Sequence, residues 1–195
     1  MKKLIAFLLT LALMMSLSAC RCSQDPATEP DPTTAPTEAT ESTKPADSKI
    51  LSGTMEENID KIMEENPVEF MGGVIPIDLE DTTEDGLLAL TGYTGLSSGA
   101  KLKDGAVYEP MMGSQAFSLV LVRVADVAET ESVARQMKQN INPRKWICVE
   151  ANQIMAAGYG DVVMFIMLDS QLGKTAQSYV DAFQKVCGGK LDFTF

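Results

Sequence analysis

The sequence of 195 residues contains no histidine. Histidine is the side chain most used as a general base near neutral pH, and it is the commonest metal ligand in proteins. Its absence excludes histidine-based catalytic triads and histidine-containing zinc sites. The four cysteines form neither a CxxC motif nor the spacing of a metal site, so cysteine redox or zinc chemistry has no support. We therefore expect no metal, no cofactor and no enzymatic activity.

Basic residues are also scarce. The chain has 16 Lys and Arg residues against 27 Asp and Glu residues, a formal net charge of −11. Removal of residues 1–19, predicted below, would leave 14 basic residues (16 less Lys2 and Lys3) against 27 acidic ones, a charge of −13. Such a surface repels phosphate backbones and anionic lipid headgroups, so nucleic-acid binding is not expected.

The N-terminal residues follow the order of a secretory signal. Met1 to Lys3 supply positive charge, an apolar run covers residues 4–15, and small residues precede Cys20. The run is too short for a membrane-spanning helix, which needs roughly 20 residues. Leu17-Ser18-Ala19-Cys20 resembles the bacterial lipobox, and this resemblance implies lipidation of the Cys20 sulfur and cleavage before it. The alternative is an ordinary secreted protein with a chance cysteine.

Proline, threonine and acidic residues dominate the segment from Cys20 to Lys49. Such a composition cannot bury enough apolar area to offset the entropy of ordering, so we predict a disordered tether. It would reach about 90 Å as extended polyproline and roughly 30 Å as a flexible coil. That length suits a domain held away from a membrane, within a Gram-positive cell wall. The predicted location is the extracytoplasmic face of the membrane, by lipid anchor.

Residues 50–195 are predicted to form a single globular domain. Thr54 and Glu57 have the spacing of a capping box and indicate a helix that ends at Asn66-Pro67. An extended piece is predicted over 74–79. A second short helix, capped by Thr83 or Thr82, is predicted to run through Leu90 and to stop at Gly92.

The remainder shows two successive β-β-α patterns. We predict strands over 106–111 and 116–124, a helix begun by a capping box of Asp126 and Glu129, strands over 146–156 and 162–168, and a helix from Ser170 to Gly188. Two of these strands are apolar on both faces, which is typical of central strands. The predicted fold is α+β: a two-layer arrangement of an antiparallel sheet with helices packed on it, preceded by one or two N-terminal helices.

Two surface motifs are candidate binding residues. Met111 and Met112 flank a predicted turn and could form an adaptable apolar contact surface, or they could fill gaps in the core. Arg144 and Trp146 are residue types enriched in binding hot spots. Trp146 could equally be a core anchor, with Arg144 solvated beside it.

Arg123 lies in an otherwise apolar strand and must be paired if it is buried. An ion pair with Glu150, Asp161 or Asp169 would satisfy it, and so would a ligand carboxylate. Cys148 and Cys187 could form a disulfide in an exported protein, or they could be buried free thiols. The acidic run over 78–85 lacks the spacing of a calcium loop and is interpreted as a solvated loop.

Three segments resemble an uncharacterised family of Gram-positive lipoproteins that carry a domain of unknown function. They are EPMMGSQAFSLVLVRV at 109–124, RKWICVE at 144–150 and GDVVMFIML at 160–168. The lipobox and the tether also look like that family. The resemblance implies a surface location and no reaction, ligand or catalytic residue.

Together these features predict a membrane-anchored, non-enzymatic binding domain at the cell envelope. Its ligand could be an envelope protein, a wall polymer or a small molecule. One alternative is an envelope hydrolase or transferase that uses carboxylates such as Glu150 and Asp161. Another is a purely structural assembly lipoprotein. The sequence indicates no oligomeric state.

Overall fold

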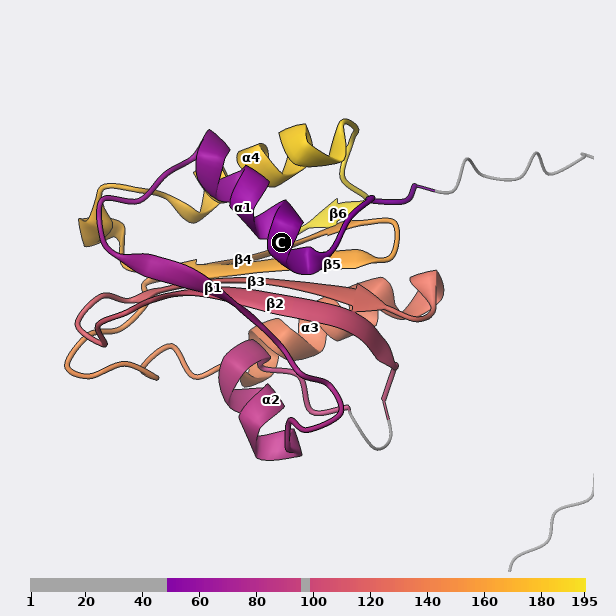
Figure 1. Ribbon diagram of the computed structural model, residues 1–195, viewed down its shortest axis with the longest axis horizontal. Coiled ribbons are helices and arrows are strands. Elements are labelled where there is room, and N and C mark those ends of the chain that lie inside the picture. The colour runs from indigo at the N-terminus through magenta and orange to yellow at the C-terminus, as the bar shows by residue number, and fades with distance from the viewer. Residues whose placement is uncertain (1–48, 96–98) are drawn as a thin grey trace, which may run out of the picture. The chain divides into compact units, whose positions relative to one another are not determined.

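The computed structural model describes residues 49–95 and 99–195, so the predicted signal peptide, the lipidation site Cys20 and almost all of the tether lie outside the described residues. Figure 1 shows the arrangement of the elements. In chain order they are α1 (Met55–Glu65), β1 (Gly72–Pro76), α2 (Glu84–Thr91), β2 (Leu102–Pro110), β3 (Phe117–Val124), the 3-10 helix η1 (Val127–Glu129), α3 (Thr130–Asn140), β4 (Gln153–Tyr159), β5 (Val162–Leu168), the 3-10 helix η2 (Ser170–Leu172), α4 (Ala176–Cys187) and β6 (Phe193–Thr194).

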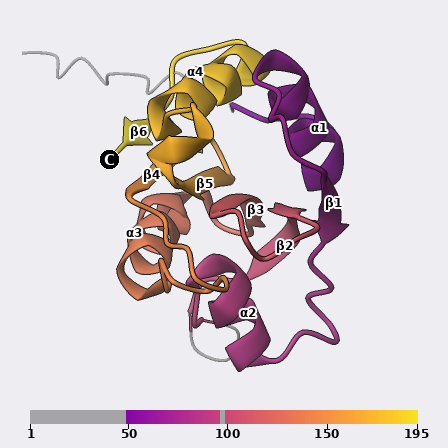
Figure 2. The same cartoon turned by 90° about the vertical axis from the view of Figure 1, so that its left-hand side faces the viewer.

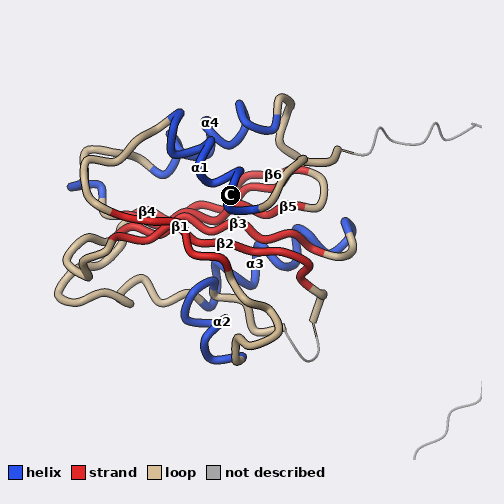
Figure 3. Tube along the Cα trace, viewed as in Figure 1, coloured by secondary structure: helices blue, strands red, loops and turns tan. Residues whose placement is uncertain are grey.

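The six strands form one antiparallel sheet in the order β1-β2-β3-β5-β4-β6 (Figure 3). The hairpins β2-β3 and β4-β5 meet through β3 and β5 at its centre, where Leu121 lies opposite Met164. Each hairpin is followed by a helix, as the two β-β-α patterns predicted. The α+β fold with an antiparallel sheet is therefore confirmed.

Helices cover both faces of this sheet, so the prediction of two layers is wrong (Figure 2). Phe117, Leu119 and Leu121 of β3 pack with α1 and α4 on one face. The alternate residues of β3, such as Val120 and Val122, pack with α2 and α3 on the other face. The physical reason is that both central strands are apolar on both faces, and each face needs a cover that excludes water.

Local sequence signals set the helix ends. Thr54 and Glu57 form the predicted capping box of α1. Thr83 caps α2, which ends at Gly92 with φ of +76°. A Cβ at Gly92 would lie 2.2 Å from the carbonyl oxygen of Met137, so only glycine fits there.

The second predicted capping box does not form. The Asp126 side chain accepts a hydrogen bond from the backbone N–H of Ala128 at 3.0 Å and caps η1 instead. Helix α3 then begins at Thr130 without a side-chain cap. The interposed 3-10 turn moves the start of the helix beyond the residues that carry the motif.

Several strand boundaries also differ from prediction. Strand β2 begins at Leu102 rather than residue 106, and β1 begins at Gly72 rather than residue 74. The stretch predicted as a strand from Trp146 is a loop, and β4 begins only at Gln153. Cys148 explains this difference because its φ of +62° interrupts an extended backbone. The two-residue β6 was not predicted.

The described chain enters at one end of the sheet, and the β2-β3 turn and the loop over 142–152 lie at the other end (Figure 1). At the entry end, Lys49 forms an ion pair with Asp192 and donates a hydrogen bond to the carbonyl oxygen of Lys190 at 2.8 Å. Asp192 also accepts from the backbone N–H of Gly160, in the β4-β5 turn, at 2.7 Å. We call the opposite end, formed by the β2-β3 turn and the loop over 142–152, the distal end.

Candidate functional site

Four large apolar side chains are exposed together at the distal end. The exposed fractions are 76% for Met71, 72% for Met111, 64% for Met112 and 74% for Ile147. Backbone hydrogen bonds join their segments: Met111 N–H donates to Met71 at 3.0 Å, and Ile147 N–H donates to Gly113 at 2.9 Å. We call these four residues the distal methionine patch.

The patch borders a hollow of 390 Å³ lined by Phe70, Met71, Met111, Met112 and Gln115. Met111 and Met112 therefore do not fill gaps in the core, and that interpretation is wrong. They lie in the turn between β2 and β3, where both side chains are mostly exposed. A contiguous apolar patch on a surface is typical of a contact site, and flexible thioethers adapt to a partner's shape.

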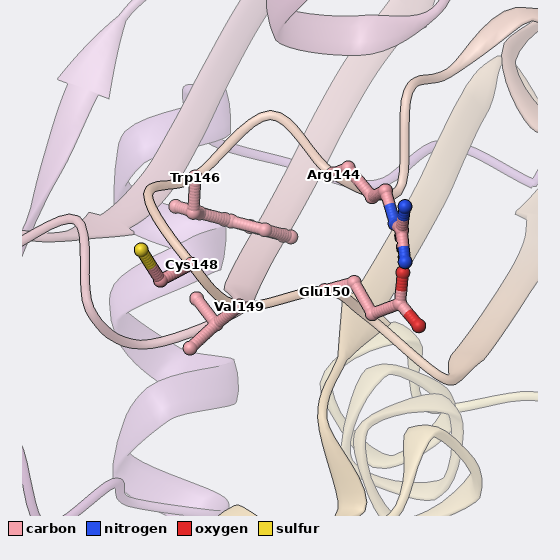
Figure 4. A pocket seen from close by; sticks show the side chains of 5 residues that line it. All are labelled: Arg144, Trp146, Cys148, Val149 and Glu150. Atoms are coloured by element: carbon pink, nitrogen blue, oxygen red, sulfur yellow. Dashed lines mark hydrogen bonds and ion pairs between the residues drawn. The ribbon is translucent and has the colours of Figure 1, made fainter.

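A second hollow, of 460 Å³, lies within the loop over 142–152 (Figure 4). It is lined by Arg144, Trp146, Cys148, Val149 and Glu150. Arg144 and Glu150 form an ion pair at its rim, and the hydrogen bond that Arg144 donates to Glu150 raises the pKa of the Arg144 guanidinium. Both side chains are exposed, so this pair adds little to stability.

Trp146 packs on the core, as one of its two interpretations predicted, and its role in binding stays a prediction. Its side chain packs against the core beneath α2 and α3, and it also lines the hollow. Its indole Nε1 is buried and has no hydrogen-bond partner among the described residues. Burying an indole N–H without a partner is costly, so this group lowers the stability of the packed loop.

A polar cluster beneath the loop was not predicted. Lys145 forms an ion pair with Glu109 at the end of β2, and its Nζ lies 3.1 Å from the Ser118 hydroxyl. Ser118 in turn donates to Glu109 at 2.9 Å. Burial lowers the pKa of Lys145, while Glu109 acts in the opposite direction. Because Ser118 is fully buried, its hydroxyl is not accessible to a substrate.

Arg123 is at the entry end, away from both hollows. Its guanidinium donates to both carboxylate oxygens of Asp161, at 2.9 and 3.0 Å. Its other terminal nitrogen donates to the carbonyl oxygens of Leu51 at 2.7 Å and Gly53 at 3.1 Å. Of the three predicted partners Asp161 is the one found. These contacts make Arg123 a structural residue and occupy its main donors.

The two cysteines of the domain are both free thiols. Cys148 is exposed in the distal loop, so its interpretation as a buried thiol is wrong. The physical reason is that residues 146–152 form a loop at the surface instead of the predicted strand. Cys187 is half-buried at the end of α4, and burial raises the pKa of its thiol from 9.0 to about 12.

The carboxylates named for hydrolytic chemistry are not brought together. Glu150 pairs with Arg144 at the distal end, whereas Asp161 pairs with Arg123 at the entry end. Among residues 49–95 and 99–195, no group of three Cys, Asp or Glu side chains could hold a metal ion. In the same part of the chain, no helix has the length and apolar character to span a membrane.

No family model, curated protein or solved structure matches the chain.

Proposed function

We propose that the chain is a lipid-anchored extracytoplasmic protein that binds a protein partner at the cell envelope through the distal methionine patch. The observation that carries this proposal is the grouping of Met71, Met111, Met112 and Ile147 at one end of the sheet, each more than 60% exposed. The chain enters the domain at the opposite end, at Lys49. An anchor that leads to Lys49 would leave the patch free.

The lipobox-like residues before Cys20 support the anchor, and the Thr/Pro segment supports a spacer. In cell fractionation, the unaltered chain should sediment with membranes and Cys20→Ala should not. Membrane retention of Cys20→Ala would contradict the anchor. Release of the unaltered chain into the medium would indicate an ordinary secreted protein instead.

Cross-linking in intact cells tests the partner. The double variant Met111→Ser/Met112→Ser removes the centre of the patch without touching the buried core. Val127→Ser is the matched control, because Val127 is an apolar side chain 60% exposed that follows β3 at the entry end. The double variant should lose a cross-linked species that the control retains. Equal recovery from both variants would overturn the patch as the contact site.

The hollow beside Trp146 favours a second candidate, a polar wall polymer. An aromatic ring can pack on the apolar face of a sugar, while the nearby Arg144–Glu150 pair can exchange hydrogen bonds with its hydroxyls. The chain has one tryptophan, so its fluorescence reports this site alone. Soluble wall glycan fragments should shift that emission in a saturable way. Emission that stays constant would reject this candidate.

A further inference from the structure

Strand β1 is an edge strand with one bare face. Met71 and Ile75 are 76% and 52% exposed, and both lie on the α2 side of the sheet. Between them, a Cβ built on Gly73 would meet no atom within 4 Å. The other face differs, because Phe70 and Val74 pack against the core under α1 and α4. The bare strip therefore belongs to one face of one strand.

The backbone groups of β1 alternate between its partner and solvent. Met71 accepts from Met111 at 3.0 Å, and Ile77 donates to Gly105 at 2.8 Å, so odd-numbered residues bond to β2. By the alternation of an antiparallel pair, Gly72 and Val74 direct their N–H and C=O groups outward. No hydrogen bond within the described ranges joins those outward groups.

Natural sheets usually protect such an edge with charged side chains, bulges or proline. Residues 72–76 include no charged residue, and Pro76 blocks only the last position. The edge is thus open over Gly72 to Val74. An open edge with an apolar flank is a template for strand addition.

We infer that β1 pairs with β1 of a second copy of this chain, antiparallel, with Gly73 on the two-fold axis. In that register Gly72 and Val74 of each copy exchange hydrogen bonds with Val74 and Gly72 of the other. Met71 then lies opposite Ile75 of the second copy on the bare face. The two glycines at the axis let the backbones approach, and Pro76 falls outside the bonded pairs.

The register of the pairing does not place acidic residues of the strand segment directly opposite one another. Glu69 would lie opposite Ile77 of the second copy, and Asp78 opposite Val68. The contact is also self-complementary, as a two-fold interface requires. A partner of different sequence would have to supply the matching apolar residues at the same spacing.

A contact confined to one pair of five-residue strands is expected to bury less than the roughly 800 Å² per partner of a standard interface. We therefore expect pairing on the membrane, where a shared surface raises the effective concentration, and dissociation in dilute solution. In this respect the inference rests on the proposed lipid anchor. Pairing at β1 would also use Met71, so this one residue is shared with the distal methionine patch.

Disulfide cross-linking of the full anchored chain tests the register. In a background of Cys22→Ser and Cys148→Ser, Gly73→Cys places two thiols at the axis. Opposed residues in a non-hydrogen-bonded pair have Cα atoms about 4.5 Å apart, within the range that a disulfide accepts. Ser114→Cys, at the exposed distal turn, is the control for random collision. Gly73→Cys should give several-fold more dimer than this control.

A mixture of Met71→Cys and Ile75→Cys chains provides a second readout. The mixture should form heterodimers, whereas each variant alone should not. Adding Gly73→Lys to both chains should abolish the cross-link, because two ammonium groups would meet at the axis. The lysine itself has open space, so the fold should persist, which circular dichroism checks.

Vesicle flotation of the same samples reports the anchor separately. If the Gly73→Cys chain floats but gives no more dimer than the Ser114→Cys control, the pairing is overturned and the anchor stands. Chains that do not float overturn the anchor, and the pairing is then read from the same cross-link at high concentration in solution. Cross-linking of the Gly73→Cys chain to a different protein would overturn a second copy as the occupant.

Discussion

Lys145 forms an ion pair with Glu109 across the space between the distal loop and the end of β2. The loop over 142–152 contains no regular secondary structure, and this pair attaches it to the sheet together with the hydrogen bond from Asn152 N–H to Leu168. The same loop carries Arg144 and Trp146 around the larger hollow. The shape of the larger hollow thus depends on the Lys145–Glu109 pair, although neither residue lines the hollow.

Lys145→Met should destabilise the domain. Removing one partner of a buried pair costs about 3–5 kcal/mol, because the other charge is left without compensation. We expect about 2 kcal/mol here, since Lys145 and Glu109 side chains remain 14% and 21% exposed. Denaturant unfolding measures this loss. The double variant Lys145→Met/Glu109→Gln should recover much of the lost free energy of unfolding. A double variant no more stable than Lys145→Met would show that the uncompensated charge of Glu109 is not the cause.

Alkaline pH should destabilise the fold partly through Cys187. Its pKa is about 12 in the folded state against an ordinary 9.0, so the folded chain keeps a proton that the unfolded chain releases. The contribution of the protonated Cys187 thiol to the free energy of unfolding is fully present below pH 9, and it is lost as pH rises towards 12. The slope for one such proton is at most about 1.4 kcal/mol per pH unit.

Cys187→Ala should flatten this slope between pH 9 and 10. Tyr93, Tyr108 and Tyr179 also have pKa values raised by burial, but from 10.0, so their effect begins at higher pH. Because the pKa of Lys145 is lowered, its deprotonation makes the folded state more stable as pH rises. This effect is the same in Cys187→Ala and in the unaltered chain, so it cancels when their stabilities are compared. Parallel stability curves for Cys187→Ala and the unaltered chain would refute this account.

The thiols should differ sharply in reactivity. Alkylation proceeds through the thiolate, so exposed Cys148 should label much faster at pH 8 than half-buried Cys187. Mass spectrometry of the native chain, with and without reductant, measures both rates. Labelling of Cys148 only after reduction would show that a disulfide forms and would refute the free thiols.

Arg123→Lys should destabilise the fold by about 1–3 kcal/mol, because an ammonium cannot reproduce the fork that a guanidinium offers. Its two-oxygen contact with Asp161 and its contacts with Leu51 and Gly53 would be lost in part. Arg135→Lys is the control, because its pair with Glu131 is more than half exposed and should matter little. Similar melting temperatures for both variants would contradict this prediction.

Prediction from sequence succeeded for several helix ends that nearby residues define, although the capping box at Asp126 and Glu129 does not form. Thr54 with Glu57, and Gly92, lie within a few residues of the helix ends that they define. The central strands were found because their apolar residues do not alternate with polar ones. The loop at Trp146 was missed because Ile147 and Val149 resemble a strand, whereas the left-handed turn at Cys148 has no sequence signature.

The candidate site was predicted only in part. Met111, Met112, Arg144 and Trp146 do lie at the distal end, but their exposure depends on how the turn and loop pack. The Lys145–Glu109–Ser118 cluster joins residues 27 and 36 positions apart. Met71 adds to the patch through the pairing of β1 with β2. Contacts between residues so far apart in the sequence depend on how the strands are ordered in the sheet. The periodicity and spacing of residue types do not reveal that order.

The contacts of Arg123 have a mechanical consequence. A force that pulls on the chain at Lys49 is resisted first by the ion pair with Asp192. It is resisted next by the hydrogen bonds that the Arg123 guanidinium donates to the carbonyl oxygens of Leu51 and Gly53. Arg123 is part of β3 and holds Asp161 beside β5, so the load passes into the two central strands. A force applied at Lys49 therefore does not detach helix α1 first. Unfolding under such a force would have to begin by breaking the contacts of the central strands.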